Sequence, residues 1–137
     1  MENILILSEK PREAMIRYAG QSLPNEACGL LAGEIRGERK MVRQAYCLTN
    51  ADESPVHFSL LPAEQVIAVK DMRKNGWMLI GSFHSHPTAP AYPSPEDIRL
   101  AFDPDLSYVI VSLLESAPVI KSFRIREGAV SEEVVSL

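Results

Sequence analysis

The sequence lacks three features, each of which would have decided its class. Two cysteines in 137 residues are too few for a disulfide framework. No apolar run approaches the ~20 residues of a membrane-spanning helix, so we expect no membrane association. Lysine and arginine number 14 against 18 aspartates and glutamates. The resulting net charge of −4 provides no basic surface for nucleic acid, and nucleic-acid binding is not expected.

The N-terminal segment "MENILILSEK" has an acidic residue before a short apolar run and lacks a small-residue cleavage site. It therefore does not resemble a secretory signal, and we expect a cytoplasmic protein. The apolar content of 46% is ordinary for a globular protein, and 137 residues suffice for one hydrophobic core. The sequence thus predicts a single domain over residues 1–137.

Hydrophobic periodicity predicts an alternation of strands and helices. The clearest helix begins at Pro62, has cations in its last turn, and ends before Gly76. The run that follows it, 77–84, is apolar on both faces, as a buried central strand is. We further expect a strand at 4–7, a helix capped by Ser8 and ending near Gly20, a hairpin of 27–35 and 41–48 with a longer loop, an irregular segment at 49–61, a helix from Ser94 to Phe102, and strands at 108–114, 119–125 and 129–137. This mixture predicts an α/β (α+β) domain with helices packed against a mainly antiparallel sheet.

The segment "HSHPTAPAYPSPED", residues 84–97, contains two of the chain's three histidines at alternate positions. Alternate side chains of a strand share a face, so His84 and His86 should point the same way and Ser85 the opposite way. Two protonated imidazoles would repel each other, and two neutral ones would fill a buried site poorly. A shared metal ion resolves both difficulties.

Asp97 is the natural third ligand of such an ion. Catalytic zinc sites usually take three protein ligands and leave one position open. Ser94 and Pro95 are typical of a helix start, which would place Asp97 in the first turn, directed back toward the strand end. A pair of histidines or a Ser-x-x-Asp segment alone indicates little, but together they predict a metal site.

The same segment resembles the signature of the JAMM (MPN+) metalloprotease family, which is H-[ST]-H-P, seven residues, Ser, two residues and Asp. The resemblance extends to "PNEACGLLAGE" at 24–34 and "LTNADESPVHFSL" at 48–60, and so covers most of the chain. It implies a JAMM/MPN-like, cytidine-deaminase-like fold. It also implies one Zn²⁺ per chain, held by His84, His86 and Asp97.

The resemblance also implies the catalytic roles. Spacing alone does not select Glu26 over Glu34, Glu53 or Glu96, but the family motif makes Glu26 the catalytic base. Zinc would activate a water molecule, and Glu26 would accept its proton and pass it to the leaving amine. Ser94 resembles the family serine that hydrogen-bonds the developing oxyanion.

Small bacterial members of the family cleave after the C-terminal Gly-Gly of ubiquitin-like sulfur-carrier proteins, whereas larger eukaryotic members carry insertions that grip ubiquitin. The resemblance therefore implies a peptidase or isopeptidase that releases cysteine or a short tail from a ThiS- or MoaD-like carrier. A non-haem iron(II) oxygenase, which also uses two histidines and one carboxylate, is the first alternative. The second is a non-catalytic MPN scaffold. The oligomeric state is left open.

Other polar residues are expected to have ordinary roles. We expect His57 to be a surface histidine or a neighbour of the ligands and not a fourth ligand. Cys28 is expected in the core and not as a nucleophile, because the sequence supplies no obvious activating base. We expect the hairpin cations to be solvated; these are Arg36, Arg39, Lys40 and Arg43. The alternative is that they bind an acidic partner.

Overall fold

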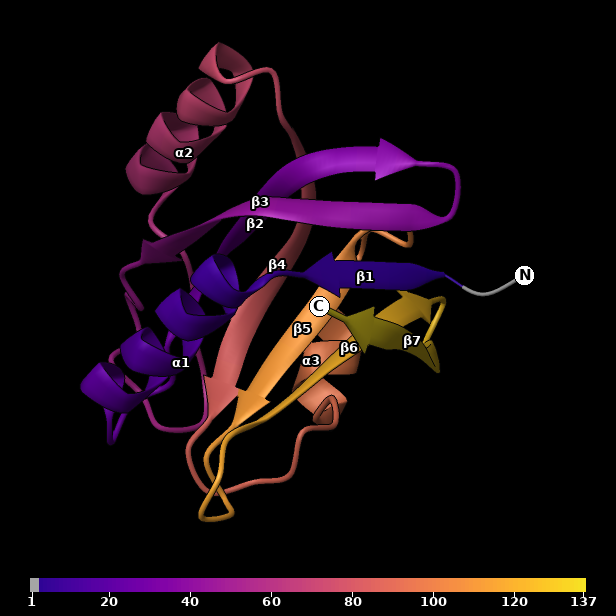
Figure 1. The fold of residues 1–137 in the computed structure, drawn as a ribbon. Helices are drawn as coiled ribbons and strands as arrows, with labels where there is room; N and C mark the ends of the chain where they lie inside the picture. The colour runs from indigo at the N-terminus through magenta and orange to yellow at the C-terminus, as the bar shows by residue number, and fades with distance from the viewer. Residues whose placement is uncertain (1–2) are drawn as a thin grey trace.

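The computed structural model describes residues 3–137, whose seven strands close into a barrel in the order β1-β3-β2-β4-β5-β6-β7 (Figure 1). The strands are β1 (Ile4–Leu7), β2 (Cys28–Arg36), β3 (Arg39–Leu48), β4 (Met78–His86), β5 (Ser107–Ser112), β6 (Val119–Arg126) and β7 (Ala129–Ser136). The helices are α1 (Glu9–Ser22), α2 (Pro62–Lys74) and α3 (Pro95–Leu100). None of the helices in residues 3–137 is long and apolar enough to cross a membrane.

The sheet is mixed, so the prediction of a mainly antiparallel sheet is only partly right. Strand β1 runs parallel to both β3 and β7, and β4 runs parallel to β5. The remaining four pairings are antiparallel. The connection from β4 to β5 carries α3 and is long enough for the crossover that parallel strands require. Periodicity does not reveal that β1 pairs with a strand at the other end of the chain.

The predicted hairpin is formed by β2 and β3, but its loop is shorter than expected. Arg36 pairs with Arg39, so only Gly37 and Glu38 make the turn. Gly37 has a φ of 61°, a conformation that favours glycine and suits a two-residue hairpin turn. The charged stretch between the strands therefore belongs mostly to the strands.

Two helix ends differ from the expectation. Ser8 occupies the N-cap position of α1, but within the described chain its side chain makes no capping hydrogen bond. Helix α3 ends at Leu100 and not at Phe102, because Ala101 already has an extended backbone. The helix predicted from Pro62 and the irregular segment 49–61 are confirmed.

The barrel wall separates one inner hydrophobic cluster from two outer ones, and β4 lies between them. On the inner side, Phe83 of β4 belongs to a cluster with Leu31, Val109 and two residues of α1, Met15 and Ala19. On the outer side, α2 packs Ala68 and Met72 against β2 (Leu30 and Ala32), and a further cluster gathers Ala91, Ile110, Phe123 and Ile125. Strand β4 is thus covered on both faces at its C-terminal half, as predicted.

Candidate metal centre

His84 and His86 lie at the C-terminal end of β4, with side chains on the outer face of the barrel wall. Strand β4 is held there by β2 on one side, up to His84, and by β5 on the other, up to His86. Both histidines are buried, and their Nε2 atoms lie 3.1 Å apart. The side chains of His84 and His86 therefore project from the same face of β4, as predicted.

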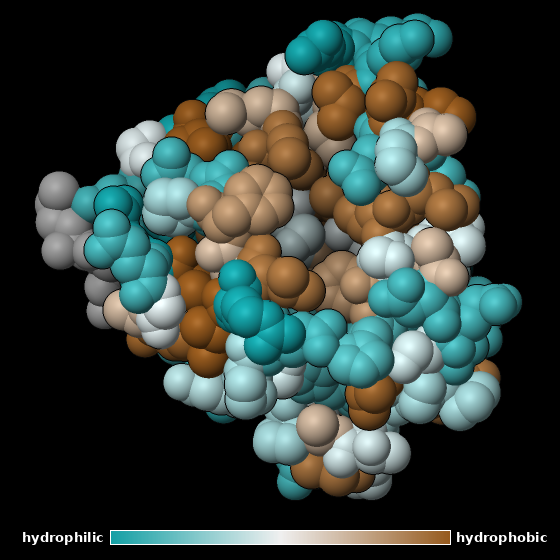
Figure 2. All heavy atoms as spheres, turned by 180° about the vertical axis from the view of Figure 1, so that it is seen from behind, coloured by the Kyte–Doolittle hydropathy of each residue, from teal (hydrophilic) through white to brown (hydrophobic). Residues whose placement is uncertain are grey.

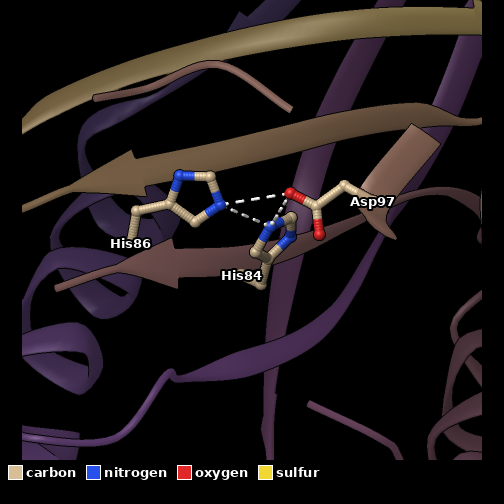
Figure 3. A group of neighbouring side chains, drawn as sticks. All are labelled: His84, His86 and Asp97. Carbon is tan, nitrogen blue, oxygen red and sulfur yellow. Dashed lines mark hydrogen bonds and ion pairs between the residues drawn. The ribbon is translucent and has the colours of Figure 1, made fainter. Parts of the chain in front are cut away.

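Asp97 reaches the histidines from the first turn of α3 (Figure 3). A capping box fixes this turn: the Asp97 amide donates to Ser94 Oγ at 3.0 Å, and the Ser94 amide donates to Asp97 Oδ2 at 2.9 Å. The same Oδ2 lies 3.0 Å from His84 Nε2 and 3.1 Å from His86 Nε2. The Asp97 carboxylate thus takes part in the cap of α3 and also contacts both histidines.

These three side chains form a group that fits a metal ion. His86 Nδ1 lies 2.9 Å from the carbonyl oxygen of Pro90, so a neutral His86 that donates there turns its Nε2 lone pair toward Asp97. When His84 also turns an Nε2 lone pair inward, electron pairs from two imidazoles and a carboxylate converge, which is unfavourable in a buried place without a cation. Ligands about 2.0–2.1 Å from tetrahedral zinc lie roughly 3.3 Å from each other, close to the separations found here.

The pKa values of Asp97 and His86 shift in opposite directions because the two side chains contact each other. Burial of Asp97 raises its pKa, but hydrogen bonds from His84 and His86 outweigh burial and hold the pKa well below its usual range. Burial lowers the pKa of His86, but its hydrogen bonds to Asp97 and Pro90 reverse this and raise the pKa. The carboxylate is therefore ionised at neutral pH and available as a ligand.

Glu26 lies beside this group, just before β2. The antiparallel pairing of β2 with β4 ends at Cys28 and His84, but one further backbone bond, from the Ser85 amide to the Ala27 carbonyl at 3.0 Å, keeps the segment before β2 beside β4. Glu26 is 5% exposed, and burial raises its pKa to about 8, with His86 opposing the rise and Asp97 adding to it. A buried carboxyl with a near-neutral pKa thus adjoins the metal group.

An apolar groove of about 330 Å³ leads to the group. Its walls include Phe58, Leu79, Tyr108 and Phe102, and His84 and Asp97 form one end. The face that carries α3 is turned toward the viewer in Figure 2, which shows hydrophobic surface around a central hollow. The groove therefore offers an apolar path to the metal group from outside.

The loop 49–61 forms one wall of this groove. Phe58 stacks on His84, with ring centroids 4.7 Å apart and an interplanar angle of 25°. The neighbouring His57 forms an ion pair with Glu96 of α3 at 2.8 Å and is 51% exposed. His57 lies outside the group of metal-binding side chains, so it contacts the opposite wall of the groove and not the metal group.

Comparison with known proteins decides the family. The model of prokaryotic homologs of the JAB domain matches residues 8–126. The chain belongs to this family. The JAMM (MPN+) resemblance of the signature is thereby confirmed, and the group of His84, His86 and Asp97 lies within the matched region.

Individual relatives of this JAB-domain protein cover much of its length. The "CysO-cysteine peptidase" of Mycobacterium tuberculosis is 35% identical over 98% of this chain and 91% of the relative. The "probable TtuB-protein conjugate cleaving protease" of Thermus thermophilus is 36% identical over 69% of this chain and 59% of the relative. A solution structure of a protein from Desulfitobacterium hafniense is 56% identical, with a TM-score of 0.88 over 96% of this chain and 90% of the other.

Sequence reasoning missed three residues that shape the site of the JAB-domain protein. Ser85 and Asn50 hydrogen-bond the backbone around Glu26, and Phe58 stacks on His84. The strand alternation that directed Ser85 away from the histidines could have indicated a buried role for it. Asn50 begins a run of turn-forming residues, "NADES", whose asparagine is typical of a side chain that organises a loop. No sequence signal indicated Phe58.

Two other residues clarify earlier expectations. Cys28 is buried on β2, and burial raises its pKa to about 12, which disfavours the reactive thiolate. The interpretation of Lys40 as part of a solvated basic hairpin is wrong, because its side chain is buried and bonds Ser107 Oγ at 2.9 Å. The Lys40 side chain points to the inner face of β3, whereas the Arg43 side chain lies on the outside and pairs with Glu34.

Proposed function

We propose that this JAB-domain protein is a zinc-dependent peptidase or isopeptidase in which His84, His86 and Asp97 bind one Zn²⁺ and Glu26 transfers the proton. The observation that carries the proposal is the convergence of three ligand atoms, from two buried histidines and the half-buried Asp97, beside a separate buried carboxyl. Zinc, when bound, supplies a Lewis acid that polarises a carbonyl group and lowers the pKa of a water molecule.

Glu26 serves as the general base and then as the general acid. A group whose pKa lies near the working pH accepts and returns a proton with little loss in either direction. Burial raises the pKa of Glu26 to about 8, which makes it a better proton acceptor than an ordinary carboxylate. Its carboxyl would take a proton from water during attack on the substrate carbonyl and give it to the leaving amine.

Ser94 has a hydrogen available for the substrate. Its Oγ accepts the hydrogen bond of the helix cap from the Asp97 amide, which uses an oxygen lone pair and leaves the O–H hydrogen free to donate. Beside the metal ligands, this hydrogen would meet the negative charge that develops on the substrate oxygen. The cap and the catalytic role are compatible for this reason.

The proposed substrate is a ubiquitin-like sulfur carrier of the ThiS or MoaD kind, extended beyond its C-terminal Gly-Gly by cysteine or a short tail. The name of the relative that matches nearly the whole chain, a CysO-cysteine peptidase, supports release of cysteine. The name of the second relative, a conjugate-cleaving protease, supports a protein substrate. Neither name supports the iron(II) oxygenase alternative.

The groove suits an extended tail. An apolar groove open to the outside admits an extended chain whose side chains pack on Phe58 and Leu79 while its backbone approaches the metal group. Glycine at the acyl side lets the backbone pass between Glu26 and Ser94, where a β-carbon would obstruct it. Recognition should therefore depend on the final glycine.

Mass spectrometry of a sulfur carrier from the same genome tests the proposal. The carrier, extended by one cysteine after Gly-Gly, should lose that residue on incubation with the zinc-loaded protein. The same carrier with its final glycine replaced by alanine is the matched control and should react far more slowly. If no carrier loses its extension, or if the alanine variant reacts equally fast, the substrate assignment is wrong.

A further inference from the structure

The segment that carries Glu26 lies outside the regular sheet. Strand β2 begins at Cys28, and its ladder with β4 ends at the pairing of Cys28 with His84. Glu26 and Ala27 therefore project beyond the strand and depend on other groups for their position. Two side chains outside the metal group supply these contacts, one from β4 and one from the loop after β3.

Ser85 holds one side of the segment. It lies between His84 and His86 in the sequence, and its side chain is fully buried. Its Oγ accepts a hydrogen bond from the Ala27 amide at 2.7 Å. Its own amide donates to the Ala27 carbonyl at 3.0 Å. The end of β4, which contains His84 and His86, therefore also holds Ala27, the residue next to Glu26.

Asn50 holds the other side. Its Nδ2 donates to the carbonyl oxygen of Glu26 at 3.1 Å and to that of His57 at 2.9 Å. Its Oδ1 accepts from the Ser59 amide at 3.3 Å, which folds the loop around the asparagine. The same loop supplies the Ser54 carbonyl that accepts from the Glu26 amide at 2.8 Å. The Glu26 backbone is thus bonded at both its amide and its carbonyl.

We propose that Ser85 and Asn50 are positioning residues that hold the Glu26 carboxyl at the distance from the metal group that proton transfer requires. The inference rests on the proposed function of Glu26. Neither residue is suited to transfer the proton itself, because the Ser85 hydroxyl is buried in a backbone contact and an amide has no titratable proton. Their contribution is geometric, and a displacement of about 1 Å can cost roughly 10²-fold in rate.

The first test compares Ser85→Ala with Ser85→Thr on the cysteine-extended carrier. Ser85→Ala removes the acceptor of the Ala27 amide, so kcat should fall by about 10- to 100-fold while KM and zinc content are unchanged. Ser85→Thr retains the hydroxyl and should recover most of kcat. Loss of zinc in Ser85→Ala, or no recovery with threonine, would overturn the role of Ser85.

The same logic applies to Asn50. Asn50→Asp keeps an acceptor but removes the hydrogen bonds that Nδ2 donates, so kcat should fall on the scale of Ser85→Ala with zinc retained. An effect confined to a higher KM would mean that Asn50 shapes the groove and does not position Glu26, and it would overturn this half of the proposal.

A double variant separates positioning of the base from any other effect. Ser85→Ala added to Glu26→Gln should lower kcat no further, because the residue through which it acts is already disabled. A further fall by the full factor seen with Ser85→Ala alone would overturn the inference. If Glu26→Gln alone leaves kcat unchanged, the failure belongs to the proposed function and not to the positioning role.

Hydrogen exchange supplies a measurement that needs no substrate. In the zinc-loaded protein, Ser85→Ala should speed exchange of the Ala27 amide, and Asn50→Asp should speed that of the Glu26 amide. The matched control is Ser122→Ala, which also removes a fully buried hydroxyl, one that donates to Glu133 at 2.7 Å on another part of the barrel. It should leave exchange at both amides unchanged. Unchanged exchange in the Ser85 and Asn50 variants would overturn the proposal.

Discussion

Two buried polar clusters lie on opposite sides of the barrel wall. On the outer side, His84, His86 and Asp97 bring their ligand atoms together at the end of β4. On the inner side, Lys40 bonds the Asp105 carbonyl at 2.5 Å and Ser107 Oγ at 2.9 Å. Both clusters bury groups that would be costly to bury alone.

The clusters differ in the source of their positive charge. The inner cluster contains its own cation, and although burial lowers the pKa of Lys40, the nearby carboxylate of Glu133 opposes that shift. In the outer cluster, among residues 3–137, no lysine or arginine pairs with Asp97. The inner cluster has a cation from the chain itself, whereas the outer cluster could hold a metal ion. We therefore expect changes in the inner cluster to affect the fold and changes in the outer cluster to affect the proposed chemistry.

Removal of one ligand should have the largest effect. His86→Ala leaves two ligands, which are too few to retain zinc, so metal content should fall from about one per chain toward zero and cleavage of the carrier should cease. Metal analysis by mass spectrometry measures the first and the carrier assay the second. Lys40→Met, in the inner cluster, is the control and should keep its zinc. Full zinc occupancy in His86→Ala would mean that the ion binds elsewhere.

Replacement of the base should have the next largest effect. Glu26→Gln keeps the size of the side chain and removes its ability to accept a proton, so kcat should fall by at least ~10²-fold. Zinc content should be unchanged, because Glu26 lies outside the group of ligands. Glu34→Gln makes the same chemical change on β2 at a half-buried place, where the carboxylate pairs with Arg43, and should leave kcat unchanged. If Glu26→Gln loses zinc, Glu26 is a ligand.

The inner cluster should respond in stability alone. Lys40→Met leaves the Asp105 carbonyl and Ser107 Oγ without their donor, although Glu133 keeps its ion pair with Arg124, and this should lower the free energy of unfolding by about 1–3 kcal/mol. Urea denaturation of the zinc-loaded variant measures this change. A lower zinc content or a lower kcat at a temperature where the variant is folded would show that the two clusters are coupled.

The smallest effect concerns pH in the metal-free protein. Burial raises the pKa of Glu26 from 4.5 to about 8, so between these values the folded state binds more protons than the unfolded state. The stability contributed by this group is therefore present below pH 4.5 and lost as pH rises through 8. Glu26→Gln should gain stability relative to the wild type by at most about 1.4 kcal/mol for each pH unit.

Urea denaturation at pH 6 and 7 with a chelator present measures this difference. Because Glu34→Gln alters a surface carboxyl that is already ionised at both values, its stability difference should not change between them. A difference for Glu26→Gln that stays constant, or that falls as pH rises, would contradict a buried carboxyl with a raised pKa.

Local pattern within the sequence determined the ligand group and most of the elements. The period of two along a strand directs His84 and His86 to one face, and the helix start at Ser94 directs Asp97 back toward them. These relations act over a few residues, so they are visible without a fold. The family signature added Glu26, whose role as base stays a prediction.

Only the tertiary structure decided which distant segments meet. The closure of the barrel by β1 between β3 and β7, the burial of Lys40, and the contacts of Ser85 and Asn50 around Glu26 all join residues far apart in the chain. Hydrophobic periodicity indicates that a strand has a buried face but not which strand lies beside it, because pairing depends on the packing of the whole chain. For this reason the sequence predicted which side chains gather at the end of β4, whereas the groups that bond the backbone around Glu26 emerged only from the fold.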